Sequence, residues 1–275
     1  MAPALPRGSA RHAQPATVGD GTDFSAVVSG KITKAVGSFH NVSSNITEKG
    51  QVGGSGPQIA NALTLQINSQ FFSGSPACAG SSNPSNCLAW QQFVYSFQNH
   101  TGFLFMQYWL INFNATCPSG WFTFSSDCFT NSSSSTLAGG PLTAKQLATV
   151  KLSGSAAAGG QDKVSLTVGS GNATLVTNRD SKIHLAAAWN TTEWGVFGDG
   201  GGGAADFGAG TTLEAQTALT DTGSSAPTCV KEGFTGETNN LKLANTPALG
   251  SQPSPTMGSK QTNGTSGTAS CAVAA

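Results

Sequence analysis

Leu88-Ala-Trp-Gln-Gln-Phe-Val-Tyr-Ser-Phe-Gln-Asn-His-Thr-Gly-Phe-Leu-Phe-Met-Gln-Tyr-Trp-Leu-Ile-Asn-Phe113 holds both tyrosines of the chain and much of its aromatic content. Its apolar residues recur at every second position, which is typical of β-strands. The first run ends before Asn99-His100-Thr101-Gly102, and the second run begins after it. The sequence therefore predicts a β-hairpin with a glycine-containing turn. The alternating residues are Phe93, Tyr95 and Phe97, then Phe103, Phe105, Gln107, Trp109, Ile111 and Phe113.

The second strand of this hairpin is apolar on its other face as well, where it carries Leu104, Met106, Tyr108 and Leu110. A strand that is apolar on both faces is covered on both sides, so we expect it inside a sheet. Gln92 and Gln107 then point toward covered surfaces. Buried amides need hydrogen-bond partners or a functional role.

Further short strands with turn signals between them predict one all-β domain, an antiparallel β-sandwich. The spacing of Leu142, Leu147 and Val150 predicts the one helix, over 141–152, and 182–189 is expected to be a strand. We expect a disordered tail at 1–20, the sandwich domain at 21–247, and a Ser/Pro/Gly/Thr-rich tail at 248–275 held, if at all, by Cys271. The other strands are expected at 24–28, 31–36, 59–68, 163–168, 173–177, 193–197 and 211–219.

The composition excludes several functional classes. Charged residues make up 9% of the chain, and 13 Lys and Arg balance 13 Asp and Glu. Without a basic stripe, nucleic-acid binding is not expected. No stretch approaches the roughly 18 apolar residues of a membrane-spanning helix. We expect a monomer without a cofactor.

The 6 cysteines predict disulfides in an oxidising compartment. Pairing of neighbours gives Cys78–Cys87, Cys117–Cys128 and Cys229–Cys271, although six cysteines allow other pairings. No Cys-X2-Cys or paired histidine predicts a metal site. Asn-X-Ser/Thr glycosylation acceptors also favour an extracellular protein, although no signal peptide is visible. These acceptors are Asn41, Asn45, Asn99, Asn114, Asn131, Asn172, Asn190 and Asn263.

Several motifs are better explained as structure than as active sites. The run Gly198–Gly203 lacks the Lys-Ser/Thr of a phosphate-binding loop and is expected to be a flexible connection. Asp199 and Asp206 could share a cation, but solvated turn acids are the simpler interpretation. His184 lies in an apolar run with no acid or metal ligand spaced around it.

Glu193, beside Trp194, is the remaining candidate for chemistry, together with Gln91, Gln92 or Gln107 of the hairpin. A carboxyl group among aromatic rings is held in its neutral form and can act as a general acid or base. A neighbouring amide can orient water or donate to an oxyanion. The alternative is a structural role for all of these groups.

These motifs resemble the glutamic peptidases (peptidase G1 or eqolisin family), which have a concanavalin A-like jelly-roll sandwich. Three segments carry the resemblance, and they follow one another in the same order as the corresponding segments of the family. They are Trp90-Gln-Gln-Phe-Val-Tyr95 leading into Gln107-Tyr-Trp-Leu110, then Gln161-Asp-Lys-Val-Ser-Leu-Thr-Val168 with Ala173-Thr-Leu175, and lastly Thr192-Glu-Trp-Gly-Val-Phe197 with Ala205-Asp-Phe-Gly208. The catalytic glutamine of the family falls at Gln91 by local match or at Gln92 by spacing to Trp109.

The resemblance does not extend to the family's catalytic glutamate, whose position carries Phe197, whereas Glu193 matches a non-catalytic acid. It therefore implies the fold and not the activity. Our first hypothesis is a secreted, non-catalytic protein that binds carbohydrate or another surface ligand through a concave sheet, with Trp109, Tyr108, Gln107 and Trp194 as binding residues. Either a glycan or a polypeptide could be the partner. The second hypothesis is an acid endopeptidase in which Glu193 works with Gln91 or Gln92.

Overall fold

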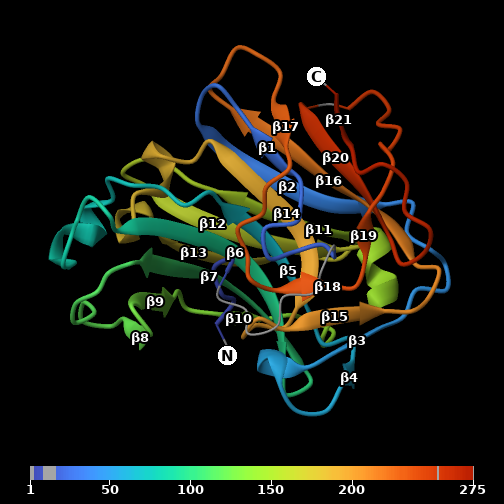
Figure 1. Cartoon of the computed structure of the whole chain (residues 1–275), viewed down its shortest axis with the longest axis horizontal. Helices are drawn as coiled ribbons and strands as arrows, with labels where there is room; N and C mark the ends of the chain where they lie inside the picture. Colours follow the sequence, from blue (N-terminus) through green and yellow to red (C-terminus); the bar gives the residue numbers. More distant parts are fainter. Residues whose placement is uncertain (1–2, 9–16, 253, 275) are drawn as a thin grey trace.

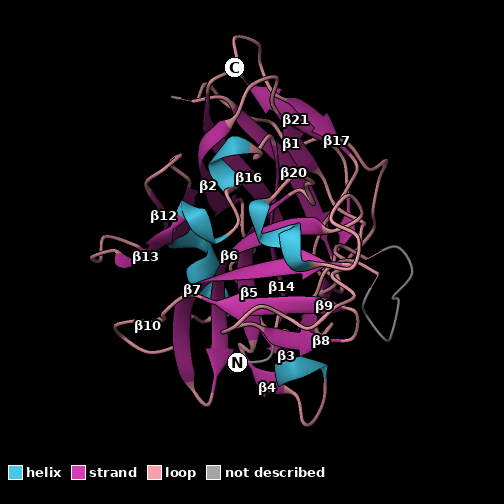
Figure 2. Ribbon diagram, turned by 90° about the vertical axis from the view of Figure 1, so that its left-hand side faces the viewer, coloured by secondary structure: helices cyan, strands magenta, loops and turns pink. Residues whose placement is uncertain are grey.

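The computed structural model describes residues 3–8, 17–252 and 254–274. Strands dominate it, and the helical elements are short 3₁₀ turns (Figure 2). Two large antiparallel sheets pack face to face, and a small four-stranded sheet lies at one end (Figure 1). This arrangement confirms the predicted antiparallel β-sandwich. The 3₁₀ turns are η1 (Val52–Gly54), η2 (Pro76–Gly80), η3 (Ala144–Thr149), η4 (Asp180–Lys182) and η5 (Leu185–Ala187).

The nine-stranded sheet has the strand order β17-β1-β14-β5-β6-β7-β9-β8, with β10 paired to β7. Its strands are β17 (Thr228–Val230), β1 (Ser25–Val27), β14 (Thr191–Gly198), β5 (Leu63–Ser69), β6 (Leu88–Gln98), β7 (Thr101–Ile111), β9 (Asp127–Asn131), β8 (Phe122–Phe124) and β10 (Ser135–Thr136).

The eight-stranded sheet has the order β13-β12-β11-β2-β16-β20-β19, with β21 paired to β20, and the small sheet has the order β18-β15-β3-β4. The eight strands are β13 (Thr174–Arg179), β12 (Gln161–Val168), β11 (Val150–Ser155), β2 (Ile32–His40), β16 (Thr212–Asp221), β20 (Thr256–Thr262), β19 (Lys242–Leu243) and β21 (Cys271–Ala274). The small sheet contains β18 (Thr238–Asn239), β15 (Ala204–Phe207), β3 (Glu48–Gly50) and β4 (Ile59–Ala60).

The predicted hairpin is β6 and β7, which pair over their full length inside the nine-stranded sheet. Its turn consists of Asn99 and His100, with φ of 48° and 59°, a pair of left-handed residues that fits the twist of a two-residue hairpin. Gly102 lies in β7 instead of the turn. A Cβ there would come within 2.7 Å of the Tyr95 ring, so this glycine makes room for Tyr95.

The two large sheets bury a common apolar core. Tyr95, Tyr108 and Trp194 point into it from the nine-stranded sheet. The Trp194 ring lies 4.8 Å from the ring of Phe39, and its indole N–H donates to the Ser38 carbonyl across the sandwich. All three predicted disulfides are present: Cys78–Cys87, Cys117–Cys128 and Cys229–Cys271.

Three local predictions were wrong. The helix expected over 141–152 is the 3₁₀ turn η3 followed by β11. The strand expected over 182–189 consists of turns, with His184 in the left-handed region. The region from 248 contains β20 and β21, which extend the eight-stranded sheet, because their edges pair with β16 and with each other.

Candidate functional site

One row of polar side chains crosses the outer face of the nine-stranded sheet, the face turned away from the common core. Its members are directly opposite one another in five successive strand pairs. Such neighbours on one face lie close enough for their side chains to interact. The polar row consists of Ser25, Glu193, Asn68, Gln92, Gln107 and Asn131, and all of them except the half-buried Asn131 are buried.

Amide hydrogen bonds connect the row. Asn68 Nδ2 donates to Glu193 Oε2 at 2.8 Å, and Gln92 Nε2 donates to Oε1 of the adjacent Gln66 at 3.1 Å. Farther along, Gln107 Nε2 donates to Asn131 Oδ1 at 2.8 Å. The amide closest to Glu193 is therefore Asn68, and Gln92 lies two strands from β14, about 10 Å away at the strand spacing of a sheet.

Glu193 is fully buried. Besides the Asn68 bond, its Oε2 accepts the backbone N–H groups of Phe234 and Thr235 at 2.9 and 3.1 Å. Burial raises the pKa of Glu193 to about 7, although these three hydrogen bonds lower it. Burial and the nearby Glu193 also raise the pKa of Asp23. A buried pair of this kind favours the protonated carboxyl below neutral pH.

Two segments, which we call the cover, lie over this face: residues 3–8 and residues 232–238. The backbone N–H of Leu5 donates to Glu237 Oε1 at 2.7 Å, and Gly236 N–H donates to the Leu5 carbonyl at 2.6 Å. Arg7 N–H donates to the Phe234 carbonyl at 2.7 Å, and Pro6 and Thr235 form an antiparallel bridge. The first segment is thus paired with the second through main-chain hydrogen bonds and one isolated β-bridge.

The side chain of Leu5 fills an aromatic pocket on the same face. It packs in one cluster with Trp90, Trp109 and Phe234, and it is 4% exposed. The Arg7 guanidinium lies over the rings of Phe71 and Phe234 and pairs with Glu232 at 2.9 Å. A residue of the expected N-terminal tail is therefore part of the core, while residues 1–2 and 9–16 of that tail lie outside the described residues.

Gln91 and Gln92 are neighbours in sequence but occupy opposite faces of β6. Gln91 points into the common core, where its Nε2 donates to Asp162 Oδ2 at 2.9 Å. Burial raises the pKa of Asp162 to about 7, and the Gln91 hydrogen bond lowers it. The structure therefore brings Gln92, not Gln91, to the face of Glu193.

The four expected binding residues also lie on two different faces of the sheet. Trp109 and Gln107 lie on the outer face, where the Trp109 indole N–H donates to Gln107 Oε1 at 3.0 Å. Tyr108 and Trp194 lie in the common core, and Trp109 is covered by its aromatic cluster. The structure does not bring these four side chains together as an open aromatic platform.

Asn68, Gln66 and Glu237 are site residues that were not predicted from the sequence. Glu237 is fully buried and accepts four hydrogen bonds, from Leu5, Gly202, Thr235 and Gln66. Asn68 and Gln66 alternate with apolar residues in β5, which was a signal for a polar outer face. Nothing in the sequence around Glu237 marks it as buried.

The glycine run after β14 is the loop that leads to β15, as predicted. Asp199 in this loop is buried and accepts hydrogen bonds from Ser96 and Phe97, whereas Asp206 accepts one from Gln58. In residues 3–8, 17–252 and 254–274, no group of three or more His, Cys, Asp or Glu side chains could hold a metal ion. Within the same ranges, no helix is long and apolar enough to span a membrane.

Two solved structures are similar to the chain over most of its length. The chain is similar to scytalido-glutamic peptidase bound to a transition-state analog inhibitor, with a TM-score of 0.38, 10% identity, and coverage of 86% of this chain and 96% of that one. It is also similar to the same peptidase with a peptide-based transition-state analog, with a TM-score of 0.35, 10% identity, and coverage of 88% and 98%. These two distant structural similarities confirm the distant resemblance to glutamic peptidases that the sequence motifs predicted. No family model matches the chain. No curated protein matches it either.

Proposed function

We propose that the protein binds an extended polypeptide on the outer face of the nine-stranded sheet, beside the polar row. The observation that supports this proposal is the docking of residues 3–8 on that face. This segment uses two means of recognition that any extended peptide can use: main-chain pairing with 234–236 and insertion of an apolar side chain. Strand addition of this kind derives affinity from main-chain hydrogen bonds and specificity from side-chain pockets.

A polypeptide ligand fits the described face better than a glycan ligand does. Glycan binding would use exposed aromatic faces, and Trp90 and Trp109 are instead covered by Leu5 and Phe234. The aromatic pocket accepts a branched aliphatic side chain. The backbone groups of the 232–238 segment supply the polar contacts.

The test is binding in trans. In the full chain carrying Leu5→Asp, the charged side chain cannot enter the aromatic pocket, so residues 3–8 leave the face. A synthetic peptide with the sequence of residues 3–8 should then bind with quenching or enhancement of tryptophan fluorescence. The same peptide with Asp in place of leucine is the control and should not bind. Equal binding of both peptides, or of neither by a folded variant, would refute the proposal.

A second candidate function is acid endopeptidase activity, which the environment of Glu193 favours. Its Oε1 and the Oε1 of Gln92 are buried without a hydrogen-bond partner in the described chain. In this function the protonated Glu193 carboxyl would give its proton to the peptide carbonyl oxygen while its other oxygen takes a proton from the attacking water. The carboxyl, again protonated, would then give a proton to the leaving nitrogen. The amide of Asn68 or Gln92 would donate to the same carbonyl oxygen as negative charge develops on it.

Cleavage of a denatured protein from pH 2 to 7 tests this candidate, with Glu193→Gln and Gln92→Ala measured alongside. Activity confined to acid and lost in Glu193→Gln would support it. Activity retained in that variant would remove Glu193 from the reaction. Gln91→Ala serves as a control, because Gln91 lies on the opposite face of the sheet and bonds Asp162.

We also propose that the protein is extracellular. Three disulfides support this location. The acceptor asparagines 45, 99 and 172 are exposed, whereas the side chains of 41, 114, 131, 190 and 263 are hydrogen-bonded, and the last three of these are also half-buried. Mass spectrometry of the protein secreted from its own cells should find glycans at members of the exposed set. Detection of the protein only inside the cells, with reduced cysteines, would refute this location.

A further inference from the structure

The outer face of the eight-stranded sheet differs in charge from the rest of the molecule. On strands β13, β12, β11 and β2, four cations are exposed: Arg179, Lys163, Lys151 and Lys34. The one carboxylate in these strands, Asp162, points into the core. These strands therefore present a positive surface on a chain whose formal net charge is zero.

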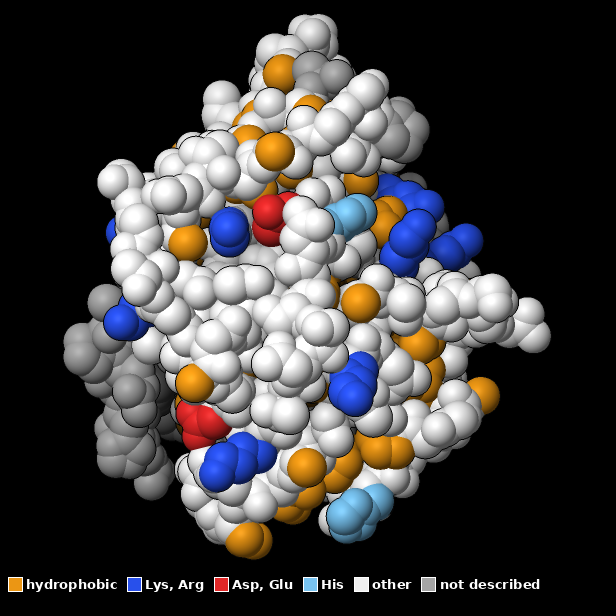
Figure 3. Space-filling model, turned by 90° about the vertical axis from the view of Figure 1, so that its right-hand side faces the viewer, with side chains coloured by type: hydrophobic (Ala, Val, Ile, Leu, Met, Phe, Trp, Pro, Cys, Tyr) orange, Lys and Arg blue, Asp and Glu red, His pale blue; other side chains and the backbone are white. Residues whose placement is uncertain are grey.

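None of these cations forms an ion pair within 4 Å in the described chain. On the adjacent strand β16, the acid Glu214 lies opposite His40 and accepts a hydrogen bond from Asn41. The one ion pair within 4 Å in the described part of the chain joins Arg7 and Glu232, on the other sheet's outer face. On one side of the molecule, Lys and Arg side chains gather beside a histidine (Figure 3). An unpaired positive surface attracts anionic partners.

The register spaces the charges along the sheet. Lys163 and Lys34 both lie opposite Ser155, one on each side, so their α-carbons are about 10 Å apart. Lys151 lies opposite Ser38, four residues along β2 from Lys34, which is about 13 Å. A single small anion cannot bridge such separations. A polymer with repeated negative charges can.

Hydroxyl groups lie between the cations, and large apolar side chains are scarce. Ser153, Ser155, Ser165 and Thr177 alternate with the cations on the outward side. Leu175 is the one large apolar side chain of these strands that is strongly exposed. The face has no aromatic ring on which bases could stack and little apolar surface to insert into a lipid bilayer. Hydroxyls among cations suit the hydroxyl and acidic groups of a sugar polymer.

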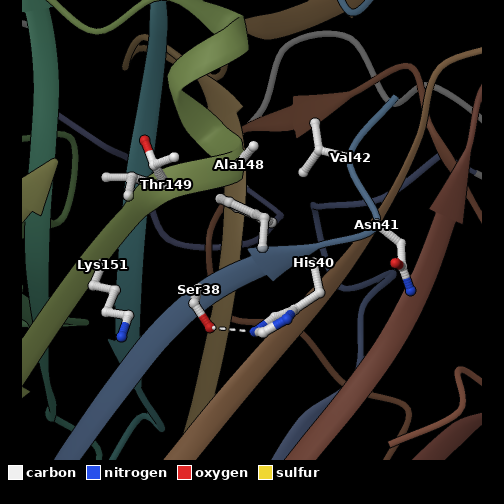
Figure 4. Close-up of a pocket in the computed structure, with 9 residues that line it drawn as sticks. Ser38, His40, Asn41, Val42, Ala148, Thr149 and Lys151 are labelled. Atoms are coloured by element: carbon white, nitrogen blue, oxygen red, sulfur yellow. Dashed lines mark hydrogen bonds between the residues drawn. The ribbon is translucent and has the colours of Figure 1, made fainter. Parts of the chain in front are cut away.

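A cavity of about 230 Å³ opens at one end of this surface. Lys151 from β11 and Ser38 and His40 from β2 project to the same side of it (Figure 4). Ser38 Oγ lies 3.2 Å from His40 Nε2, and Lys151 is the cross-strand neighbour of Ser38. An ammonium group, a hydroxyl and an imidazole around one hollow are the donors that a carboxylate or sulfate group accepts from.

We propose that the outer face of β13, β12, β11 and β2 binds an anionic polysaccharide, with one acidic group in the cavity lined by Ser38, His40 and Lys151. The face is remote from the polar row, on the opposite side of the sandwich. This inference is therefore independent of polypeptide binding.

Binding to immobilised polysaccharides tests the proposal. The full chain should be produced without N-glycans, because the acceptor Asn41 also lines the cavity. Polygalacturonate supplies carboxylates, dextran sulfate supplies sulfates, and plain dextran is the uncharged control. We expect retention on one or both acidic polymers and none on dextran, with release as NaCl rises from about 0.05 to about 0.5 M, because salt screens exposed charges.

The variant Lys34→Gln/Lys151→Gln/Lys163→Gln should weaken this binding by at least about tenfold, since three attractive charges are lost. The matched control, Lys49→Gln/Lys231→Gln/Lys242→Gln, removes the same number of exposed charges outside the four strands, with Lys242 on β19 at the other edge of the sheet, and should change it by less than about twofold. Equal loss in both variants would overturn the proposal. The proposal would also be overturned if the acidic polymers did not retain the protein, or if dextran retained it equally well. Tighter binding to anionic lipid vesicles or to DNA would overturn it too.

Discussion

The backbone N–H of Leu5 donates a 2.7 Å hydrogen bond to Oε1 of Glu237, 232 residues farther along the chain. This bond and the aromatic pocket hold residues 3–8 over the polar row. We expect Leu5→Asp to release the segment, because an unpaired charge cannot remain among Trp90, Trp109 and Phe234. Trypsin cleavage after Arg7 should then become at least about tenfold faster, since the opened population sets the rate. Cleavage after Lys49 in β3 is the internal control, and an unchanged ratio of the two rates would contradict this view of the cover.

Stability should be highest in acid. Burial raises the pKa of seven carboxyl groups, to about 8 for Glu48 and to about 7 for Asp162, Glu193 and Asp199. The other three are Asp23, Asp127 and Glu237. The unfolded groups titrate near pH 4, so between about pH 4 and 8 the folded state binds more protons than the unfolded state. The free energy of unfolding therefore falls as pH rises through this window.

Thermal unfolding measures this effect. A loss of about 2 kcal/mol lowers the Tm of a domain of this size by roughly 4–8 °C, so the Tm at pH 8 should be lower than the Tm at pH 4 by at least that much. Glu48→Gln should make the Tm depend less steeply on pH, because it replaces a buried carboxyl group with an amide that does not titrate. Both oxygens of Glu48 are buried without partners in the described chain. A Tm that stays level or rises from pH 4 to pH 8 would show that these carboxyls are not held neutral.

Gly37 of β2 makes room for the indole ring of Trp194, which comes from the other sheet. A Cβ at Gly37 would lie 2.1 Å from Cδ2 of the indole. We expect Gly37→Ala to destabilise the protein by about 1–3 kcal/mol through overpacking, measured by urea unfolding. Gly250→Ala is the matched control, because a Cβ there meets nothing within 4 Å. Equal effects of the two changes would argue against this packing.

The Cys229–Cys271 disulfide joins β17 of one sheet to β21 of the other. It closes a loop with a sequence separation of 42, for which chain entropy gives a stabilisation of about 4 kcal/mol. Cys229→Ala/Cys271→Ala should lower stability and speed amide exchange in 271–274. Cys117→Ala/Cys128→Ala should leave exchange at β21 unchanged. If both pairs of substitutions loosened β21 equally, the disulfide would not be its specific anchor.

The central hairpin could be predicted because its signal is local. Alternating aromatic residues and a short polar interruption specify two adjacent strands without reference to the rest of the chain. The disulfides were predictable for a related reason, since each cysteine paired with its neighbour in sequence. The wrong helix at 141–152 also had a local pattern, but pairing of β11 with β2 and β12 decided its conformation.

The polar row could not be predicted, because it depends on the register of strands that are distant in sequence. Glu193, Asn68 and Gln92 align only when β14, β5 and β6 are paired. The cover could not be predicted either. Leu5 and Glu237 lie in segments without strand periodicity, and they become buried only when these two distant segments pack together. To choose between Gln91 and Gln92, one must know which of them lies on the same face of the sheet as Glu193, and the sequence did not decide this.

Site-specific crosslinking tests polypeptide binding on the outer face most directly. A peptide with the sequence of residues 3–8 and a photoreactive leucine analogue at its leucine is mixed with the full chain carrying Leu5→Asp and irradiated. If the peptide binds on this face, we expect crosslinks to Trp90, Trp109 or Phe234 that excess unlabelled peptide removes by competition. Crosslinks confined to other surfaces, or unaffected by the competitor, would contradict it.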